Sequence, residues 1–200
     1  MRLFYASPSP FARKVRVLIA EKQLSGIEAI KVNPFAQPSE LVQANPLSKV
    51  PALCLPDGTM LYDSPVICDY LDRRGKGPAL IPQDGPARWA VLRRQALADG
   101  LMDTGLSLSL EINRRPEEER SPKWIAHWVD TMARCVAAME TEIAQFGAEL
   151  DLGHISTACA LAYLDLRAAA HLDWRGLCPA LTAWFAAFEQ RPSMQSTRPE

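Results

Sequence analysis

The sequence predicts two folded units of different class: an α/β unit with a mixed four-stranded sheet, followed by an all-helical unit. Three observations predict this. Eleven of the 16 prolines lie in residues 1–86, whereas all five tryptophans lie beyond them. Short apolar runs alternate with helical patterns only in the first part. There are 10 basic and 7 acidic residues before Pro82, against 12 and 16 after it, so the first unit is the better site for an anion.

The composition excludes several classes of protein. The chain has 200 residues, 48% hydrophobic and 22% charged, which indicates a globular fold rather than disorder. Its net charge of −1 gives no basic surplus for nucleic acid. The start lacks a signal-peptide pattern, and no stretch reaches the roughly 18 apolar residues of a membrane helix. We therefore expect a cytoplasmic protein with neither nucleic acid nor membrane as partner.

The cysteines and histidines predict neither disulfides nor a metal site. The five cysteines are odd in number, widely spread and without a C-x-x-C pair, which indicates reduced core residues in a reducing compartment. The three histidines have no metal-ligand spacing.

The first unit reads, in order, β-α-β, a short helix, then β-β-α. Apolar runs at residues 3–6, 27–32, 52–55 and 60–62 predict the strands. Asp57-Gly58 between the last two runs predicts a tight hairpin, because Gly adopts a positive φ without strain, so those strands should be antiparallel. Glycines and prolines in residues 74–86 break the periodicity and predict a linker over the surface.

The sequence predicts helices throughout the second unit. One long helix stops before Pro116, and the next begins at Ser121. A third follows Asp151 as N-cap and carries so few charges that we expect it to be the central buried helix. A last one follows Pro179. The tryptophan and methionine stripe at residues 124–139 is interpreted as core.

Ser9 is the first candidate for chemistry. It follows the first strand and caps the first helix, with Pro10 at the first helical position. The free N–H groups and positive dipole of a helix start favour an anion, such as a thiolate held beside the Ser9 hydroxyl. The alternative is that Ser9 only caps the helix. Arg13 and Lys14 would add positive potential, although the favoured interpretation has both pointing to solvent.

Two further segments could bind a ligand through the backbone or a helix start. Val50-Pro51 precedes a short strand, and a cis bond there would leave the Val50 backbone free to pair with an extended ligand; the alternative is an ordinary trans proline. Asp63 and Ser64 compete to cap the next helix, where Asp63 could meet an amino group and Ser64 a carboxylate. The alternative at this dipeptide is capping alone.

The order and spacing of these segments resembles the glutathione S-transferase superfamily, with its thioredoxin-like N-terminal domain. The segments that carry the resemblance are SPSPFARKVR, NPLSKVPAL and LYDSPVICDYLD. It continues into DLGHISTACALAYLDLR and the tail RPSMQSTRP, and so covers nearly the whole chain.

The resemblance implies glutathione as co-substrate, no metal, and a role in detoxification. The implied glutathione-binding residues are Ser9, Phe11, Lys49, Val50, Asp63 and Ser64. Ser9 would hydrogen-bond the sulfur and favour its thiolate. The Val50 backbone would pair with the cysteinyl part before a cis Pro51, and Lys49 would lie near the glycyl carboxylate. Asp63 and Ser64 would hold the γ-glutamyl amino and carboxylate groups.

The absence of a cysteine near Ser9 favours a conjugating enzyme over one that works through mixed disulfides. The electrophile, small and mostly apolar, would lie between the domains near Phe11, Asp103 and Ser107. A free thiol with a pKa of roughly 8.5 is only about 3% thiolate at neutral pH, and lowering that pKa by about two units requires roughly 2.7 kcal/mol. One hydroxyl donor together with a helix N-terminus supplies an effect of this size.

The expected domains are residues 1–76, a linker at 77–85 and a helical domain at 86–200, in a homodimer. One departure from the family pattern is Asp151 with His154, where the family has serine or threonine followed three residues later by aspartate. The N-cap survives, but the reciprocal arm of the capping box should be lost or altered, with His154 either a variant cap partner or a locally tuned group. A non-catalytic protein of this fold that binds apolar ligands or a partner is the second hypothesis. A glutaredoxin-like reductase is disfavoured by the missing cysteine.

Overall fold

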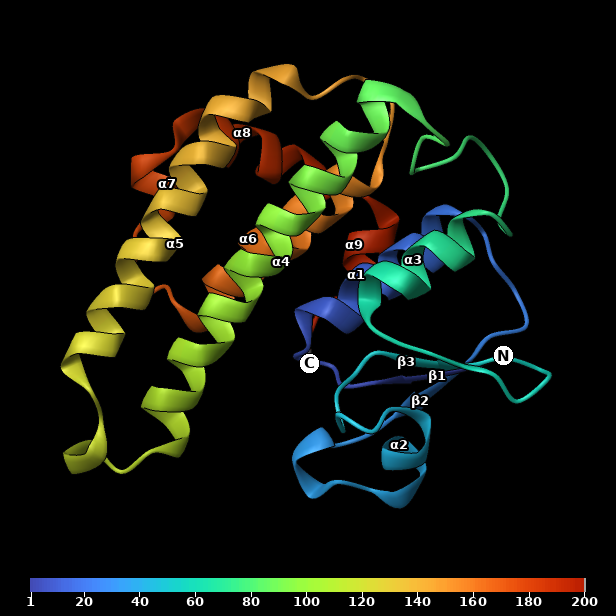
Figure 1. Cartoon of the computed structure of the whole chain (residues 1–200). Helices are drawn as coiled ribbons and strands as arrows, with labels where there is room; N and C mark the ends of the chain where they lie inside the picture. Colours follow the sequence, from blue (N-terminus) through green and yellow to red (C-terminus); the bar gives the residue numbers. More distant parts are fainter. Residues whose placement is uncertain (200) are drawn as a thin grey trace. The chain divides into compact units, whose positions relative to one another are not determined.

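A computed structural model describes residues 1–199 as two compact units (Figure 1). The first comprises Met1–Gln83 together with the segment that begins at Pro192, and the second comprises Asp84–Arg191. The sequence assigned residues 86–200 to one helical domain, whereas the chain from Pro192 onward groups with the first unit. Each unit has its own core and is described separately.

The sheet of the first unit is mixed and four-stranded, as predicted. Its strands are β1 (Arg2–Tyr5), β2 (Glu28–Lys31), β3 (Ala52–Cys54) and β4 (Met60–Leu61), in the spatial order β2-β1-β3-β4. β1 runs parallel to β2 and antiparallel to β3, and β3 runs antiparallel to β4. The hairpin turn has Gly58 at φ +86°, as the Asp57-Gly58 signal requires.

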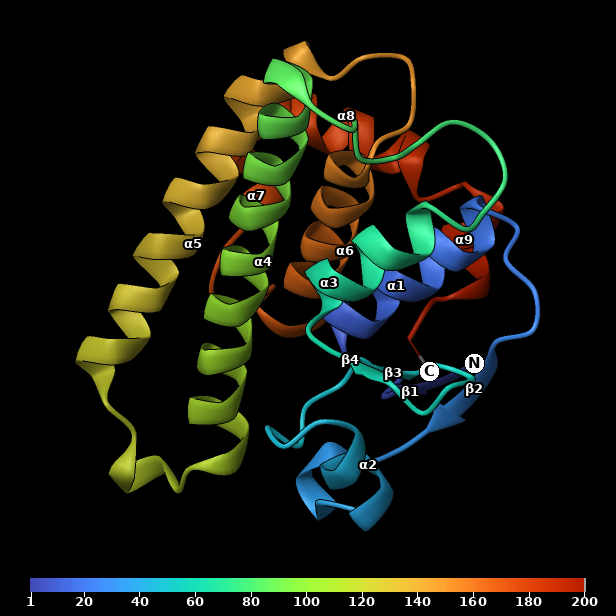
Figure 2. The ribbon, with the colours of Figure 1, turned by 45° about the vertical axis from the view of Figure 1, so that its right-hand side comes forward.

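Both faces of the sheet are covered by helices. The helices are α1 (Pro10–Glu21), the 3-10 turn η1 (Pro34–Ala36), α2 (Ser39–Ala44), α3 (Ser64–Asp72) and α9 (Pro192–Ser196). Figure 2 shows α1 and α3 on one face and α2 on the other. Phe4 and Ala52 are buried against Leu41 of α2, while Leu3 and Leu53, one residue along each strand, face the opposite side.

The segment after α3 is held by a buried ion pair. Lys22 Nζ lies 3.0 Å from Asp72 Oδ1, and both side chains are buried. The Asp72 carboxylate also accepts hydrogen bonds from the Leu80 and Ile81 amides, each at 2.9 Å. Lys22 Nζ donates to the Pro78 carbonyl at 2.9 Å. The prediction of a linker over the surface is therefore wrong at Leu80 and Ile81, whose side chains are buried and whose amides are bound to Asp72.

The second unit is helical along all of its described elements. They are α4 (Gly85–Arg114), η2 (Glu117–Glu119), α5 (Pro122–Glu142), η3 (Ile143–Gln145), α6 (Leu152–Arg167), α7 (Trp174–Leu177) and α8 (Pro179–Phe188). Every residue of α6 from Leu152 to Leu161 is buried, so α6 is the central helix, as predicted. α4 packs against α6 at Gly105, where an added Cβ would come within 3.4 Å of the Tyr163 ring, about van der Waals contact.

The aromatic end of the stripe on α5 differs from the prediction. Met132, Val136 and Met139 belong to the core, but Trp124 is 53% exposed. Its ring stacks on that of Trp128 with centroids 5.8 Å apart. The stripe is core only from its second half onward, because the first turns of α5 extend beyond the packed region.

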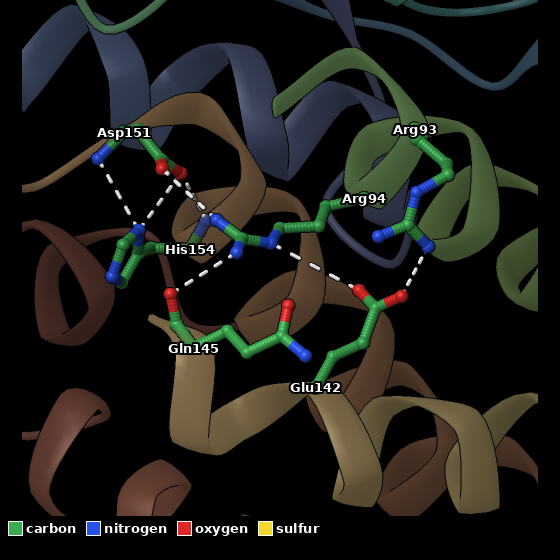
Figure 3. Close-up of polar contacts among 6 residues, drawn as sticks. All are labelled: Arg93, Arg94, Glu142, Gln145, Asp151 and His154. Atoms are coloured by element: carbon green, nitrogen blue, oxygen red, sulfur yellow. Dashed lines mark hydrogen bonds and ion pairs between the residues drawn. The ribbon is translucent and has the colours of Figure 1, made fainter. Parts of the chain in front are cut away.

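The start of α6 is tied to α4 and to the end of α5 (Figure 3). Asp151 Oδ1 accepts the His154 amide at 3.0 Å, and the Asp151 amide donates to His154 Nδ1 at 3.3 Å. His154 thus replaces the aspartate of the family pattern, and the reciprocal arm of the capping box is altered rather than lost. Arg94 of α4 contacts Asp151 at 3.5 Å and Glu142 at 3.9 Å. No helix among the described residues is long and apolar enough to cross a membrane.

Candidate functional site

The strand register of the first unit brings the three predicted segments to one edge of the sheet. Ser9 follows the carboxyl end of β1. Because β3 is antiparallel to β1, with Ala52 opposite Phe4, the Val50-Pro51 segment lies beside that end. Because β4 is antiparallel to β3, the chain leaves β4 toward Asp63 at the same edge.

Ser9 is the N-cap of α1 and is half-buried. Its Oγ accepts the Ala12 amide hydrogen at 3.2 Å, which confirms the capping role. A hydroxyl has one hydrogen to donate and two lone pairs, so this bond leaves the Ser9 O–H available to a ligand. Capping and sulfur activation are therefore compatible in one side chain.

Arg13 and Lys14 are buried, so the favoured interpretation that both point to solvent is wrong. Lys14 is fully buried, and Arg13 is 7% exposed. Arg13 Nη2 donates to the Met194 carbonyl of α9 at 3.0 Å. Both cations lie in the first two turns of α1, where they add to the positive potential at its N-terminal half.

The Val50-Pro51 peptide is cis, as the resemblance implied. Val50 lies just before β3, outside the strand ladder, and its backbone makes no hydrogen bond to another residue among those described. The segment can therefore pair with an extended ligand through the main chain.

The start of α3 presents a carboxylate and a buried hydroxyl. Asp63 is the N-cap, is exposed, and accepts the Ser64 amide hydrogen. Ser64 is fully buried, and its Oγ has no hydrogen-bond partner in the protein. A buried polar atom without a partner carries a desolvation cost, so its presence at a helix start indicates a ligand group that completes it. The Tyr62-Asp63 peptide is also cis, and no local signal predicts a cis bond before a residue other than proline.

Two other predicted glutathione residues lie in the same unit. Lys49 is exposed next to Val50, and Phe11 is half-buried in the first turn of α1. Lys49 can offer a cation at the surface, and its role toward a glycyl carboxylate remains a prediction.

Asp103 and Ser107, predicted for the electrophile, lie one turn apart on α4 of the second unit. Asp103 is exposed and Ser107 is half-buried. The Ser107 hydroxyl donates to the Asp103 carbonyl at 2.9 Å, within the helix. Their role toward an electrophile remains a prediction.

Neither metal ligation nor disulfide chemistry is built into the described part of the chain. Residues 1–199 contain no group of three or more His, Cys, Asp or Glu side chains that could hold a metal ion. The five cysteines are free thiols, four of them buried. Burial raises the pKa of the Cys135 and Cys178 thiols, which keeps them protonated and unreactive.

Asn45 also lies at this edge, at the start of the segment NPLSKVPAL, and the sequence did not predict a role for it. Its side chain is buried and bridges two backbone groups of the turn before Val50. The signal that could have found it is Asn before Pro46, since Asn readily hydrogen-bonds the backbone two residues on.

Comparisons with known proteins decide the family. Residues 8–74 match the model of the glutathione S-transferase N-terminal domain, and residues 122–187 match that of the C-terminal domain. A crystal structure of a glutathione transferase family member from Pseudomonas fluorescens Pf-5, with bound glutathione, is 43% identical at a TM-score of 0.93. The match covers 100% of this chain and 98% of that one. The chain belongs to the glutathione S-transferase family.

Two further relatives support this family assignment. The uncharacterized GST-like protein YibF of Escherichia coli K12 is 33% identical over 170 residues, which cover 84% of this chain and 83% of YibF. Maleylacetoacetate isomerase of Pseudomonas aeruginosa is 32% identical over 157 residues, covering 74% and 71% of the two chains. The first unit of this glutathione S-transferase family member is thus the thioredoxin-like N-terminal domain, and the second is the helical C-terminal domain.

Proposed function

We propose that the protein is a glutathione transferase of the conjugating type, in which Ser9 holds the glutathione sulfur as a thiolate. The thiolate attacks an electrophilic carbon of a small, mostly apolar molecule. A carbon–sulfur bond forms, the thiol proton passes to water, and a leaving group departs where the electrophile has one. The bound glutathione of the Pseudomonas fluorescens family member supports the choice of co-substrate.

The observation that carries the proposal is the buried, unpartnered Ser64 hydroxyl at the start of α3. A γ-glutamyl carboxylate at this helix start would accept the Ser64 O–H and meet the positive end of the helix dipole. The γ-glutamyl amino group would then lie near the exposed Asp63 carboxylate. The Val50 backbone, beside the cis peptide, would pair with the cysteinyl part of the same molecule.

Ser9 acts on the sulfur through its free O–H. The Ala12 amide donates to Ser9 Oγ, which polarises the hydroxyl and strengthens its own donation to a thiolate. The α1 dipole and the buried Arg13 and Lys14 favour the same negative charge. A shift of the thiol pKa by about two units needs roughly 2.7 kcal/mol, which is of the size expected from a charge-assisted hydrogen bond and a helix start together.

Three broader parts of the proposal follow from the family. We propose that the protein works as a homodimer in the cytoplasm and takes part in detoxification. Phe11, Lys49, Asp103 and Ser107 keep the binding roles given above as proposals. No nucleic acid, membrane or metal is part of the proposed reaction.

The experiment follows the ultraviolet absorbance of the thiolate while glutathione is added at neutral pH. Ser9→Ala removes the hydroxyl, and Ser9→Gly removes it with less loss of capping. Ser121→Ala is the matched control, because Ser121 caps α5 before Pro122 as Ser9 caps α1 before Pro10. All three variants can be compared by urea unfolding.

We expect a saturable thiolate signal in the wild type that falls about tenfold or more in both Ser9 variants. Ser9→Ala and Ser121→Ala should each lose about 1 kcal/mol of unfolding free energy, and only the first should lose the signal. Saturable binding by calorimetry without a thiolate signal in the wild type would support the non-catalytic binding protein instead. No binding of glutathione would refute the proposed function.

A further inference from the structure

The turn that joins α2 to the cis peptide is organised by one buried side chain. Asn45 is 2% exposed. Its Oδ1 accepts the Leu47 amide hydrogen at 3.0 Å, and its Nδ2 donates to the Lys49 carbonyl at 2.9 Å. The Asn45 carbonyl also accepts the Ser48 amide hydrogen at 2.8 Å. One residue therefore holds three successive positions of the turn.

This turn needs to be held, because Ser48 has an unfavourable backbone conformation. Its φ is +51°, in the left-handed region that L residues with a Cβ seldom adopt. The Ser48 hydroxyl donates to the Pro34 carbonyl at 3.3 Å, which ties the turn to η1. Without Asn45, the turn would relax toward a conformation with negative φ at Ser48.

The bond to Lys49 sets the direction of the next amide. A peptide unit is planar, so the carbonyl of Lys49 and the N–H of Val50 lie in one plane and point in opposite directions. Asn45 Nδ2 fixes the Lys49 oxygen and thereby aims the Val50 N–H. That N–H has no partner among the described residues and belongs to the group proposed to pair with the cysteinyl part of glutathione.

We propose that Asn45 is a positioning residue for glutathione, which orients the Lys49–Val50 peptide so that the Val50 N–H meets the cysteinyl carbonyl. This inference rests on the proposed function. Asn45 itself does not touch the ligand, and its effect is on affinity rather than on the sulfur.

The test compares Asn45→Asp with Asn113→Asp. Each variant replaces an amide that donates to a backbone carbonyl at 2.9 Å with a carboxylate that cannot donate. Asn45→Asp keeps the acceptor for the Leu47 amide, but it loses the bond to Lys49 and turns a buried oxygen toward the Lys49 carbonyl, which also lowers stability. Asn113 lies exposed on α4, in the other unit, and serves as the control for the loss of one amide-to-carbonyl bond. Calorimetry measures the Kd for glutathione, and urea unfolding measures stability.

We expect Asn45→Asp to raise the Kd about tenfold, the size expected when one ligand hydrogen bond is misdirected. The pKa of the bound thiol should stay as in the wild type. Asn113→Asp should lower stability less, because Asn113 is exposed, and should leave the Kd within about twofold.

A second variant separates positioning from stability. Ser48→Gly removes the strain of the positive φ, so Asn45→Asp combined with Ser48→Gly should recover stability while the Kd stays raised. Recovery of both in the double variant would overturn the inference, because Asn45 would then act only on folding. An unchanged Kd in Asn45→Asp would overturn it as well. A wild type that does not bind glutathione would refute the proposed function and this inference with it.

Discussion

At the scale of single residues, two buried serine hydroxyls without hydrogen-bond partners lower the stability of the folded protein. Only one of them, on Ser64, is proposed to gain a partner when glutathione binds. Ser64 Oγ and Ser156 Oγ both lie in fully buried side chains on helices, one in each unit. A buried hydroxyl without a partner destabilises the folded state unless a ligand satisfies it. A site that is costly in the free protein and complete only in the complex is the usual compromise between stability and function.

Ser64→Ala should therefore stabilise the free protein and weaken glutathione binding. We expect the unfolding free energy to rise by up to about 1 kcal/mol, because the unsatisfied hydroxyl is gone. The Kd for glutathione should rise at least about tenfold, because a hydrogen bond to a charged carboxylate contributes roughly 1.5–3 kcal/mol. Urea unfolding without ligand and calorimetry measure the two effects. Ser156→Ala, the control, should stabilise the free protein to a similar degree and leave the Kd unchanged; a destabilised Ser64→Ala with normal affinity would contradict the assignment.

The sequence predicts single residues well where a local motif reports them. Ser9 stands directly before Pro10 and Asp63 two residues before Pro65 at helix starts, and both are N-caps in the structure. The burial of Arg13 was not predictable, because its partner, the Met194 carbonyl, lies 181 residues away in the chain. Local periodicity cannot show that α9 covers a face of α1 that carries cations.

At the scale of elements, helix starts are the best-predicted features, since their signals are short and local. Ser121 and Asp151 cap α5 and α6 as expected. The pieces the sequence missed, such as α7 and α9, span only 4 or 5 residues. So short a helix shows no amphipathic period, and it forms because packing within its unit holds it.

The N-terminus of α6 should make the second unit sensitive to acid. Burial raises the pKa of the Asp151 carboxyl, but the hydrogen bonds and charge of His154, with the charge of Arg94, outweigh it and leave the pKa below the usual value of 3.8. Because the folded pKa is the lower one, the ionised carboxylate stabilises the fold. That contribution is complete above about pH 5 and is lost as the pH falls through the unfolded and then the folded pKa.

Asp151→Asn should therefore be less stable than the wild type at pH 7, and the difference should shrink on going to pH 3. The amide keeps an acceptor for the His154 amide hydrogen but loses the attraction to Arg94. Urea unfolding at several pH values between 3 and 7 measures the difference. Asp84→Asn is the control, because the Asp84 side chain at the start of α4 makes no capping hydrogen bond. A difference that persists unchanged at pH 3 would show that the charge of Asp151 does not stabilise α6.

At the scale of the whole molecule, the change of composition along the chain predicts two units, because a sheet covered by helices and a bundle of helices need different residue types. A sheet with helices on both faces needs prolines and glycines at its many turns, whereas a helical unit needs long periodic segments. At this scale the structure differs from the prediction in two chain segments outside these patterns, Leu80–Ile81 and the tail from Pro192. Their places depend on contacts between residues far apart in the chain, such as Lys22 with Pro78 and Arg13 with Met194, which periodicity does not report.

The buried pair of Lys22 and Asp72 should decide how firmly the segment after α3 is held. Asp72→Ala leaves Lys22 buried without its partner and removes the acceptor for the Leu80 and Ile81 amides. The loss of one partner from a buried ion pair destabilises by about 3 kcal/mol or more. The matched control is Asp69→Ala on the same helix, since Asp69 pairs with Arg73 at the surface, where such pairs contribute less than about 1 kcal/mol.

Trypsin should cleave Asp72→Ala after Lys76 faster than it cleaves the wild type, because the released segment opens independently of global unfolding. Equal cleavage rates and equal unfolding free energies for the two variants would mean that burial of the apolar side chains, and not the ion pair, holds this segment in place.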